Sequence, residues 1–306
     1  MGLLHGSLTP PSLAARPLNA AMMRLLSPDG ARPVDFSIPP GAPALAPPDS
    51  VSWRIFKNPV SLFIGGVAAV ILELGEPRVR SGVWDHSSFR SKPAHRLART
   101  GLAAMVTVYG PRQSAEAMIA GVRRMHDRVT GTTPDGVPYR ANDPELLDWV
   151  QATAGFGFME AYHAFVRPLS QADRDRAYAE AQPAASLYGA TGAPRSDAEM
   201  AEMFARFAPR LERSEIVFEF LDLMRTAPVL PGAMRPLQRI LVRAAVEMTP
   251  DWARRTLDLG PDRGLRAGEA GLVRALGKQS DRVVLTAHPA VQACRRMGLP
   301  DDYLYR

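Results

Sequence analysis

The stretch PVSLFIGGVAAVIL, from Pro59 to Leu72, is the longest apolar run in the sequence. It is shorter than the roughly 20 residues that a helix needs to cross a bilayer, and it contains paired glycines. We therefore interpret it as a buried helix, from about Asn58 to Leu74, at the centre of the fold. Peripheral contact with a membrane is compatible with this interpretation.

The segments that follow also have a helical pattern of apolar residues. Asp143 is a candidate N-cap with Pro144 at the first helical position, and Ser170 and Ser196 can open two further helices. The helix after Ser196 must be kinked or split at Pro209. The other predicted helices span residues 88–109, 111–129, 144–165, 236–248, 250–258, 267–276 and 289–297. Alternating segments of Val, Ile, Thr and Tyr are scarce, so we expect no sheet.

Proline and glycine divide the chain into two parts. Residues 1–50 are rich in both and close with PPGAPALAPPDS, which predicts an extended or disordered arm with one short helix near residues 18–26. Residues 51–306 contain no clean linker. The expected architecture is a single all-α domain, residues 51–306, preceded by this arm.

Composition excludes several function classes. The net charge of +6 is mild for a nucleic-acid binder, and there is no run of five Lys or Arg. A helical regulator that binds acidic partners through its arginines is an alternative that only this charge supports. We therefore expect no nucleic-acid partner. The single cysteine, Cys294, rules out an intramolecular disulfide and fits a buried thiol. The first residues lack the features of a secretory signal, and a cytoplasmic location is the default expectation.

The segment PAHRLARTGLAAMVTVYG contains a candidate polar site. Arg96, Arg99 and Thr100 are spaced i, i+3 and i+4, so they share one helix face at the start of an apolar segment. Guanidinium groups in that position can bind a carboxylate or a polarised oxygen. The same spacing also describes an ordinary solvated helix start.

His126 lies in the apolar stripe of the next helix. Ile119, Val122, His126 and Val129 recur at intervals of three and four residues and so share one face. A histidine in such a stripe can be a core residue with satisfied hydrogen bonds, or an axial haem ligand in an apolar pocket. His86, in VWDHSSFRSKP, is expected just before a helix that one of its neighbours caps.

Familiar enzyme motifs are missing. The sequence contains no HExxH, CxxC, GxSxG, P-loop or GxGxxG pattern, and Glu and His stand three apart only at Glu160 and His163, whereas a di-iron bundle needs such a pair on each of two helices. This weakens the zinc-hydrolase, serine-hydrolase, NTPase and dinucleotide-binding alternatives.

Six segments, taken in order, resemble one family. They are DHSSF, RLART, VRRMHDRVTG, PDGVPY, NDPELLDWVQAT and LP..MRPLQR followed by PDWARR. Together, over roughly Asn58 to Leu259, the chain resembles the haem oxygenases that include the mycophenolic-acid side-chain oxygenase and the bacterial latex-clearing proteins. Each segment is weakly specific alone, and the ordered set carries the resemblance.

The resemblance implies an all-helical fold that binds one haem b through a proximal histidine, which matches His126. The latex-clearing members carry a distal Arg, Lys and Thr, and these match Arg96, Arg99 and Thr100. It also implies dioxygen and a lipophilic, olefinic or isoprenoid substrate, with oxidative cleavage of a carbon–carbon double bond as the reaction of the best-known relatives.

Two positions depart from the family pattern. Arg99 stands where the latex enzymes have a lysine that can bind iron, and a guanidinium stays charged, so an open or water-occupied sixth iron position is expected. In the resemblance, Gln151 stands where many members carry a histidine. The catalytic carboxylate proposed for rubber cleavage has three candidates by sequence proximity, Glu73, Glu76 and Asp85.

The sequence therefore predicts a haem-b-dependent oxygenase in which His126 binds the iron and Arg96, Arg99 and Thr100 form a distal polar group that acts in catalysis. The alternatives are a haem-binding or haem-sensing protein without turnover, and a family member that has lost the cofactor.

Overall fold

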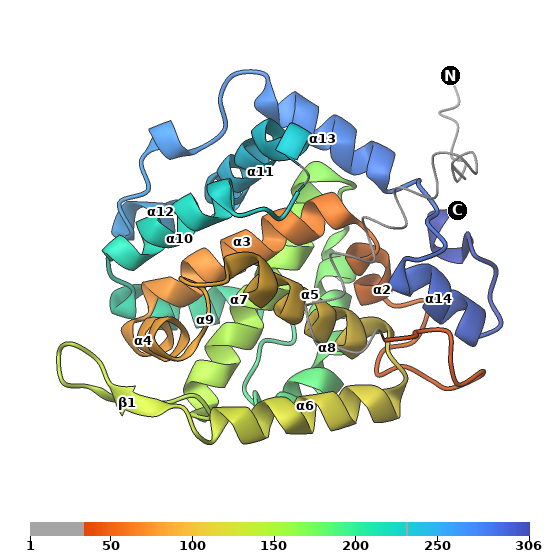
Figure 1. Cartoon of the computed structure of the whole chain (residues 1–306), viewed down its shortest axis with the longest axis horizontal. Coiled ribbons are helices and arrows are strands. Elements are labelled where there is room, and N and C mark those ends of the chain that lie inside the picture. The colour runs from red at the N-terminus through yellow and green to blue at the C-terminus, as the bar shows by residue number, and fades with distance from the viewer. Residues whose placement is uncertain (1–33, 231) are drawn as a thin grey trace.

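The computed structural model of the protein describes residues 34–230 and 232–306 (Figure 1). The short helix expected near residues 18–26, and most of the N-terminal arm, lie outside these residues. The structure is almost entirely helical, which confirms the all-α fold class. Its helices are α2 (Val51–Phe56), α3 (Pro59–Gly75), α4 (Pro77–His86), α5 (Pro93–Tyr109), α6 (Arg112–His126), α7 (Pro144–Phe165), α8 (Gln171–Tyr188), α9 (Asp197–Phe207), α10 (Glu215–Thr226), α11 (Arg235–Met248), α12 (Asp251–Thr256), α13 (Glu269–Ser280) and α14 (Pro289–Arg296).

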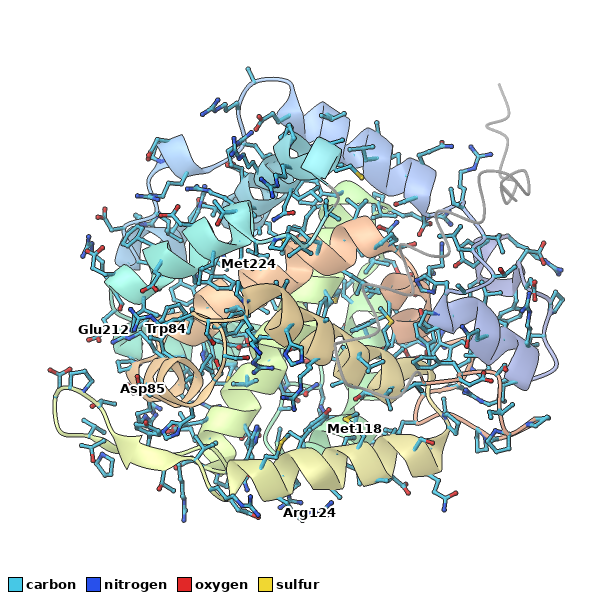
Figure 2. The ribbon with its side chains drawn as sticks, viewed as in Figure 1. Trp84, Asp85, Met118, Arg124, Glu212 and Met224 are labelled. Atoms are coloured by element: carbon cyan, nitrogen blue, oxygen red, sulfur yellow. The ribbon has the colours of Figure 1, made fainter. Side chains whose placement is uncertain are left out.

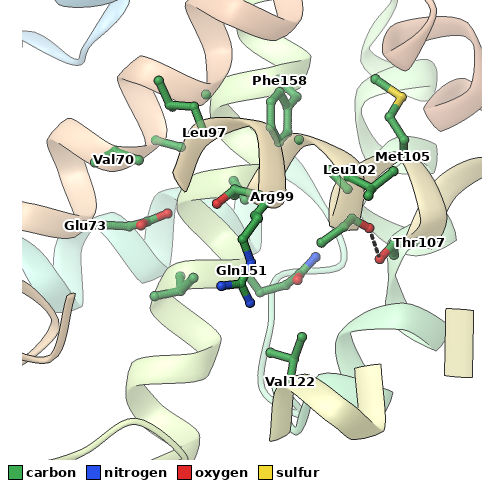
Figure 3. Close-up of a pocket in the computed structure, with 18 of the residues that line it drawn as sticks. Val70, Glu73, Leu97, Arg99, Leu102, Met105, Thr107, Val122, Gln151 and Phe158 are labelled. Carbon is green, nitrogen blue, oxygen red and sulfur yellow. Dashed lines mark hydrogen bonds between the residues drawn. The ribbon is translucent and has the colours of Figure 1, made fainter. Parts of the chain in front are cut away.

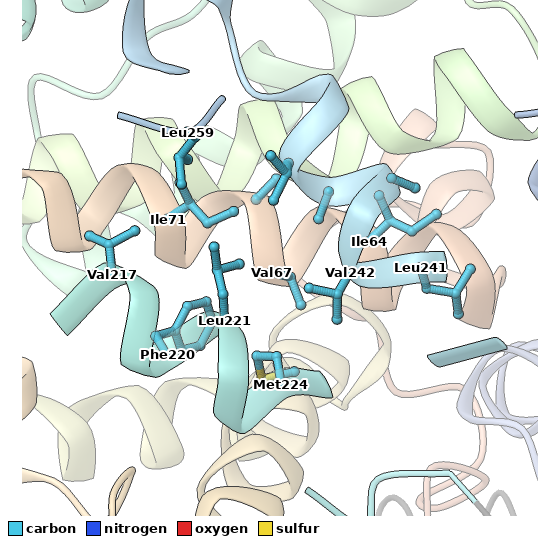
Figure 4. Close-up of a cluster of buried hydrophobic side chains, with 14 of the residues drawn as sticks. Ile64, Val67, Ile71, Val217, Phe220, Leu221, Met224, Leu241, Val242 and Leu259 are labelled. Atoms are coloured by element: carbon cyan, nitrogen blue, oxygen red, sulfur yellow. The ribbon is translucent and has the colours of Figure 1, made fainter. Parts of the chain in front are cut away.

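Helix α3 lies at the centre, as its apolar composition predicts. Its residues Ile64, Val67 and Ile71 are buried, and they pack against α10 and α11 in one hydrophobic cluster (Figure 4). Phe220 of α10 and Val242 of α11 are fully buried on the other side of that contact. The apolar run is therefore the core helix of the fold.

Among the described residues, no single helix is both long and apolar enough to cross a membrane. Helices α3 and α4 satisfy the length and composition together, but they are bent by 112° at the break between them.

Local capping determines where several helices begin. The side chain of Asp143 accepts a hydrogen bond from the Glu145 amide at the start of α7. Ser170 and Ser196 cap α8 and α9 in the same way, as predicted. After α9 the chain forms a short 3₁₀ turn that contains Pro209 and then begins α10, so Pro209 splits the helical segment.

Helix α6 is amphipathic and covers the lower face of the molecule in Figure 1. Met118 points from this helix toward the interior and Arg124 points to solvent (Figure 2). Helix α5 lies directly inside it, and α7 rises from near the left end of α6 and passes behind α5 (Figure 1). The three helices therefore bound the space in which the functional residues lie.

Two expectations about the segments near this space are wrong. The chain does form a small antiparallel sheet, in which β1 (Thr130–Thr132) pairs with β2 (Pro138–Arg140). Its turn contains Gly136 at φ +82°, a conformation that glycine adopts without strain. A hairpin this short has too few residues to produce a visible alternating pattern.

The second error concerns His86, which was expected before a helix. It is instead the last residue of α4, and the following helix α5 begins only at Pro93. Neither Ser87 nor Ser88 caps α5, whose N-cap residue Lys92 makes no side-chain cap bond. Helix α4 was missed because its capping residue is Glu76, whose carboxylate accepts from the Val79 amide, and glutamate is not a preferred N-cap.

The described part of the arm, residues 34–50, is packed on the helical body. Phe36 and Leu45 are buried there beside α5 and α14. Arg296 anchors the segment from within, because its guanidinium donates to the carbonyl oxygens of Phe36 at 2.6 Å and Ala42 at 2.9 Å. Cys294 is buried in the same cluster, as expected.

Candidate active site

A large cavity lies among α3, α5, α6 and α7 (Figure 3). Its volume is about 2050 Å³. Pockets that hold one drug-sized ligand measure roughly 300–1,000 Å³, so this cavity has room for a cofactor together with a substrate. Its walls are mainly apolar and include Val70, Leu102, Met105, Val122 and Phe158.

All four side chains singled out in the sequence line this cavity: Arg96, Arg99, Thr100 and His126. The first three come from α5, and His126 is the last residue of α6. The side chains spaced i, i+3 and i+4 on α5 and the histidine in the apolar stripe of α6 therefore face the same cavity. Only the packing of α5 against α6 could show this.

Arg96 and Thr100 form a polar pair one helical turn apart. The guanidinium of Arg96 donates to the Thr100 hydroxyl, which in turn donates to the Arg96 carbonyl oxygen at 3.0 Å. Arg96 also lies over the ring of Phe89, 5.5 Å from its centroid. These contacts hold the guanidinium in a fixed position against the cavity wall.

Of the three candidate carboxylates, Glu73 of α3 is the one that lines the cavity. Burial raises the pKa of Glu73 to about 7, although the positive charge of Arg96 acts to lower it. The Thr153 hydroxyl lies 3.4 Å from Glu73 Oε1 but is also within hydrogen-bond distance of two backbone carbonyl oxygens of its own helix, so it stabilises the carboxylate weakly. Glu73 can therefore gain or lose a proton near neutral pH.

The other two candidate carboxylates have different surroundings. Glu76 caps α4 and accepts a hydrogen bond from the Arg78 guanidinium at 2.8 Å, so its carboxylate has a structural role. Neither Glu76 nor Asp85 lines the cavity. The tertiary structure thus separates Glu73 from two neighbours that the sequence could not rank.

His126 presents an uncharged ring to the cavity. Burial lowers the pKa of His126, and the positive charge of Arg96 lowers it further. The imidazole is therefore neutral at neutral pH, which is the form that binds a metal. The influence of Arg96 on this ring also indicates that the two side chains lie within electrostatic reach of each other.

One ring nitrogen of His126 has no hydrogen-bond partner among the described residues. Nδ1 is buried without a hydrogen bond, and so is Oδ1 of Asn142. The amide of Asn142 lies beside the ring and acts to raise the pKa of His126. Oδ1 of Asn142 and Nδ1 of His126 nevertheless do not reach hydrogen-bond geometry. The amide nitrogen of Asn142 is held by the Arg123 carbonyl at 3.0 Å and by Asp127 at 2.6 Å. Asn142 was not identified from the sequence, because it approaches His126 from the loop after the hairpin.

Three more histidines line the cavity, and each differs from His126. His86 Nε2 is hydrogen-bonded to the Tyr139 hydroxyl at 3.1 Å, and His288 Nδ1 accepts from the Ala290 amide at 3.0 Å. His95 has a buried Nδ1 without a partner, but it belongs to α5, the helix that carries Arg96. Of the four, His126 alone projects from α6, across from that helix.

These residues fit a haem. The cavity is large and apolar, a neutral histidine lines it, and arginines that can bind the haem carboxylates lie around it. Within residues 34–230 and 232–306, no three His, Cys, Asp or Glu side chains gather to hold a bare metal ion. A haem requires a single histidine from the protein, and His126 can supply it.

Comparison with known families agrees with this geometry. Residues 53–278 match the family described as ER-bound oxygenase mpaB/B′/rubber oxygenase, catalytic domain. No curated protein matches the chain, and no solved structure matches it. The matched residues include α3 and α5 to α7, the helices that form the cavity. The match covers most of the chain and confirms the resemblance found in the sequence, so this protein belongs to the mpaB and rubber oxygenase catalytic-domain family.

Proposed function

We propose that this protein is a haem-b-dependent oxygenase that uses dioxygen to oxidise a lipophilic substrate. The observation that carries the proposal is the joint placement of His126 and Arg96 on the same apolar cavity, close enough for the charge of Arg96 to lower the pKa of the ring. The family match supports oxygenase chemistry. Olefinic and isoprenoid compounds are the substrate class to test first, with cleavage of the double bond as the candidate reaction.

In this proposal His126 holds the haem iron. Its neutral imidazole supplies the lone pair, and Asn142 Oδ1 orients the ring by accepting from Nδ1 once that nitrogen carries its proton. Such a partner fixes the tautomer of a metal-binding histidine. When bound, the haem supplies the dioxygen chemistry, and the protein supplies the ligand, the polar groups and the shape of the cavity.

Arg96, Arg99 and Thr100 are the polar groups that act in catalysis. Thr100 accepts a hydrogen bond from the Arg96 guanidinium, so the remaining N–H groups of Arg96 have a fixed position toward the cavity. Preorganised donors of this kind stabilise negative charge that develops during a reaction. Arg99 adds a permanent positive charge on the same helix face.

Glu73 is the proposed proton acceptor. Its carboxylate lies in the cavity with a pKa of about 7, so an appreciable fraction is ionised at neutral pH and can take a proton from the substrate onto Oε1 or Oε2. The positive charge of Arg96 favours the ionised carboxylate and so increases this fraction.

The haem assignment is tested by absorption spectroscopy of protein purified from haem-supplemented cells, before and after reduction and addition of carbon monoxide. Wild type is expected to show a Soret band that shifts with carbon monoxide. His126→Ala is expected to lose this band, whereas His95→Ala, a change to another cavity histidine, is expected to keep it. Circular dichroism establishes that both variants are folded. Loss of the band in His95→Ala alone would transfer the ligand role to His95.

Turnover is tested separately by dioxygen consumption with olefinic isoprenoids. Consumption that depends on substrate and on Glu73 is expected of an oxygenase. A protein with a normal Soret band and no consumption across such substrates would instead be a haem-binding protein without turnover.

A further inference from the structure

The cavity has more positive than negative side chains. Five arginines line it, Arg78, Arg96, Arg99, Arg140 and Arg235, whereas the acidic side chains among the described lining residues are Glu73 and Glu180. Both glutamates have other partners. Glu180 accepts from the Val51 amide at 2.8 Å and from Arg176 at 2.6 Å, and Glu73 interacts with Arg96. An occupant with negative charge would complement this cavity.

Arg99 is the cationic group best placed to bind such an occupant. It has no ion pair with the described residues, whereas Arg78 is bound to Glu76 and Glu145. Figure 3 shows its side chain extending from α5 into the cavity beside Gln151 of α7. Arg99 is exposed where it lines the cavity, so its guanidinium donors are accessible to an incoming carboxylate.

Gln151 adds a second donor to the same place. Its amide makes no hydrogen bond with the described part of the chain. The Thr100 hydroxyl, by contrast, is occupied by both the guanidinium and the carbonyl group of Arg96. The free polar groups at this point are therefore an arginine fork and an amide N–H, which together match the two oxygens of a carboxylate.

We propose that Arg99 and Gln151 bind the carboxylate of an amphiphilic substrate whose hydrocarbon chain lies along the apolar wall. This proposal rests on the function proposed above, because it names the class within the lipophilic substrates. Phe158, Leu102 and Met105 line the same cavity, above and to the right of Arg99 in Figure 3, and provide the surface for the chain.

The test compares two ligands that differ only in the head group, citronellate and citronellol, by titration calorimetry. Wild type is expected to bind the acid roughly ten- to a hundredfold more tightly than the alcohol, as a charged hydrogen-bonded pair predicts. Arg99→Gln is expected to abolish this preference while changing the affinity for citronellol less than about twofold. Arg99→Lys should retain part of the preference, because a lysine keeps the charge without the fork.

Two further variants make the comparison specific. Gln151→Leu is expected to reduce the preference by a smaller factor. Arg235→Gln, which removes another unpaired cavity arginine from α11, is the matched control and is expected to leave the preference unchanged. Loss of the preference in Arg235→Gln instead of Arg99→Gln would overturn the assignment.

The haem carboxylates are the competing partner for Arg99. If they occupy it, Arg99→Gln will release haem faster to a haem-accepting protein while wild type and variant bind citronellate equally, and the proposal is overturned.

Calorimetry does not depend on haem, so the two proposals fail separately. A protein without a Soret band that still prefers the acid supports the carboxylate site and contradicts the oxygenase, whereas a Soret band without the preference contradicts the carboxylate site alone.

Discussion

Gly65 of α3 and Gly157 of α7 meet backbone to backbone. A Cβ atom placed on Gly65 would lie 2.5 Å from the Gly157 carbonyl oxygen, closer than any real contact of this kind. The two helices can approach this closely because neither residue has a side chain. Since α3 carries Glu73 and α7 carries Gln151, this crossing determines how far apart two walls of the cavity stand.

Gly65→Ala is therefore expected to destabilise the protein by roughly 1–3 kcal/mol, the usual cost of overpacking a core. Chemical denaturation measures this change. Gly66→Ala is the matched control, since a Cβ there would meet the Phe158 ring at an ordinary 3.7 Å. The control should match wild type or gain up to about 1 kcal/mol from helix propensity. Equal stability of both variants would show that the helices can move apart at no cost.

The pKa of Glu73 predicts a particular dependence of stability on pH. Glu73 ionises near pH 7 in the folded protein and near its ordinary value of 4.5 when unfolded. Between these values the folded state binds more protons, so stability falls as pH rises, by up to about 3 kcal/mol from this group. Glu73→Gln cannot ionise. It should therefore be more stable than wild type at pH 8, and the difference should shrink toward pH 4.5. Parallel pH curves for the two proteins would contradict the shifted pKa.

The same group predicts the pH profile of turnover. If the ionised Glu73 accepts a proton, the rate constant kcat should rise through an apparent pKa of about 7 and level off above it. In Glu73→Gln we expect a large loss of kcat and no such limb. Haem content, read from the Soret band, should remain unchanged. A retained limb would assign the titration to another group.

Asn142 is expected to act on haem binding through His126. Asn142→Leu removes the oxygen that faces the ring, and loss of such a partner typically weakens binding at the metal by 10- to 100-fold. Asn142→Asp keeps an acceptor there and should retain haem. The rate of haem transfer to an acceptor protein measures both. Equal rates for the two variants would show that Asn142 does not orient the ring.

A buried ion pair joins the start of α3 to the C-terminal part of the chain. Lys57 Nζ lies 2.6 Å from Asp281 Oδ1, and both side chains are at most 4% exposed. Lys57→Met leaves the Asp281 carboxylate buried with weaker partners, which should cost about 3–5 kcal/mol in unfolding free energy.

Asp301→Ala breaks the exposed pair between Arg295 and Asp301, and it serves as the control. It should cost no more than about 1 kcal/mol, because solvent screens that pair. A similar loss of unfolding free energy in both variants would show that the buried pair contributes no more to stability than the exposed pair.

The sequence by itself determined the helices and several of their ends. The apolar run Pro59–Leu72 is the buried core helix, and Asp143 and Ser170 cap the helices that they were predicted to cap. These features depend on a helical repeat and on hydrogen bonds between residues a few positions apart, so a short window of sequence contains the whole interaction. Helix α4 and the hairpin were missed because their local signals are weak: an unusual capping residue in one case and three-residue strands in the other.

The candidate site was predictable only in part, for the same physical reason. Arg96, Arg99 and Thr100 share a helix face that spacing reveals, and His126 interrupts an apolar stripe. That these groups line one cavity depends on α5 packing against α6, and the selection of Glu73 depends on α3 crossing α7 at two glycines. The pKa of Glu73 likewise comes from burial among residues distant in sequence, with Arg96 acting on it from another helix. Local hydrogen bonds and periodicity are determined by the sequence, whereas burial and charge proximity between distant residues exist only once the helices have packed.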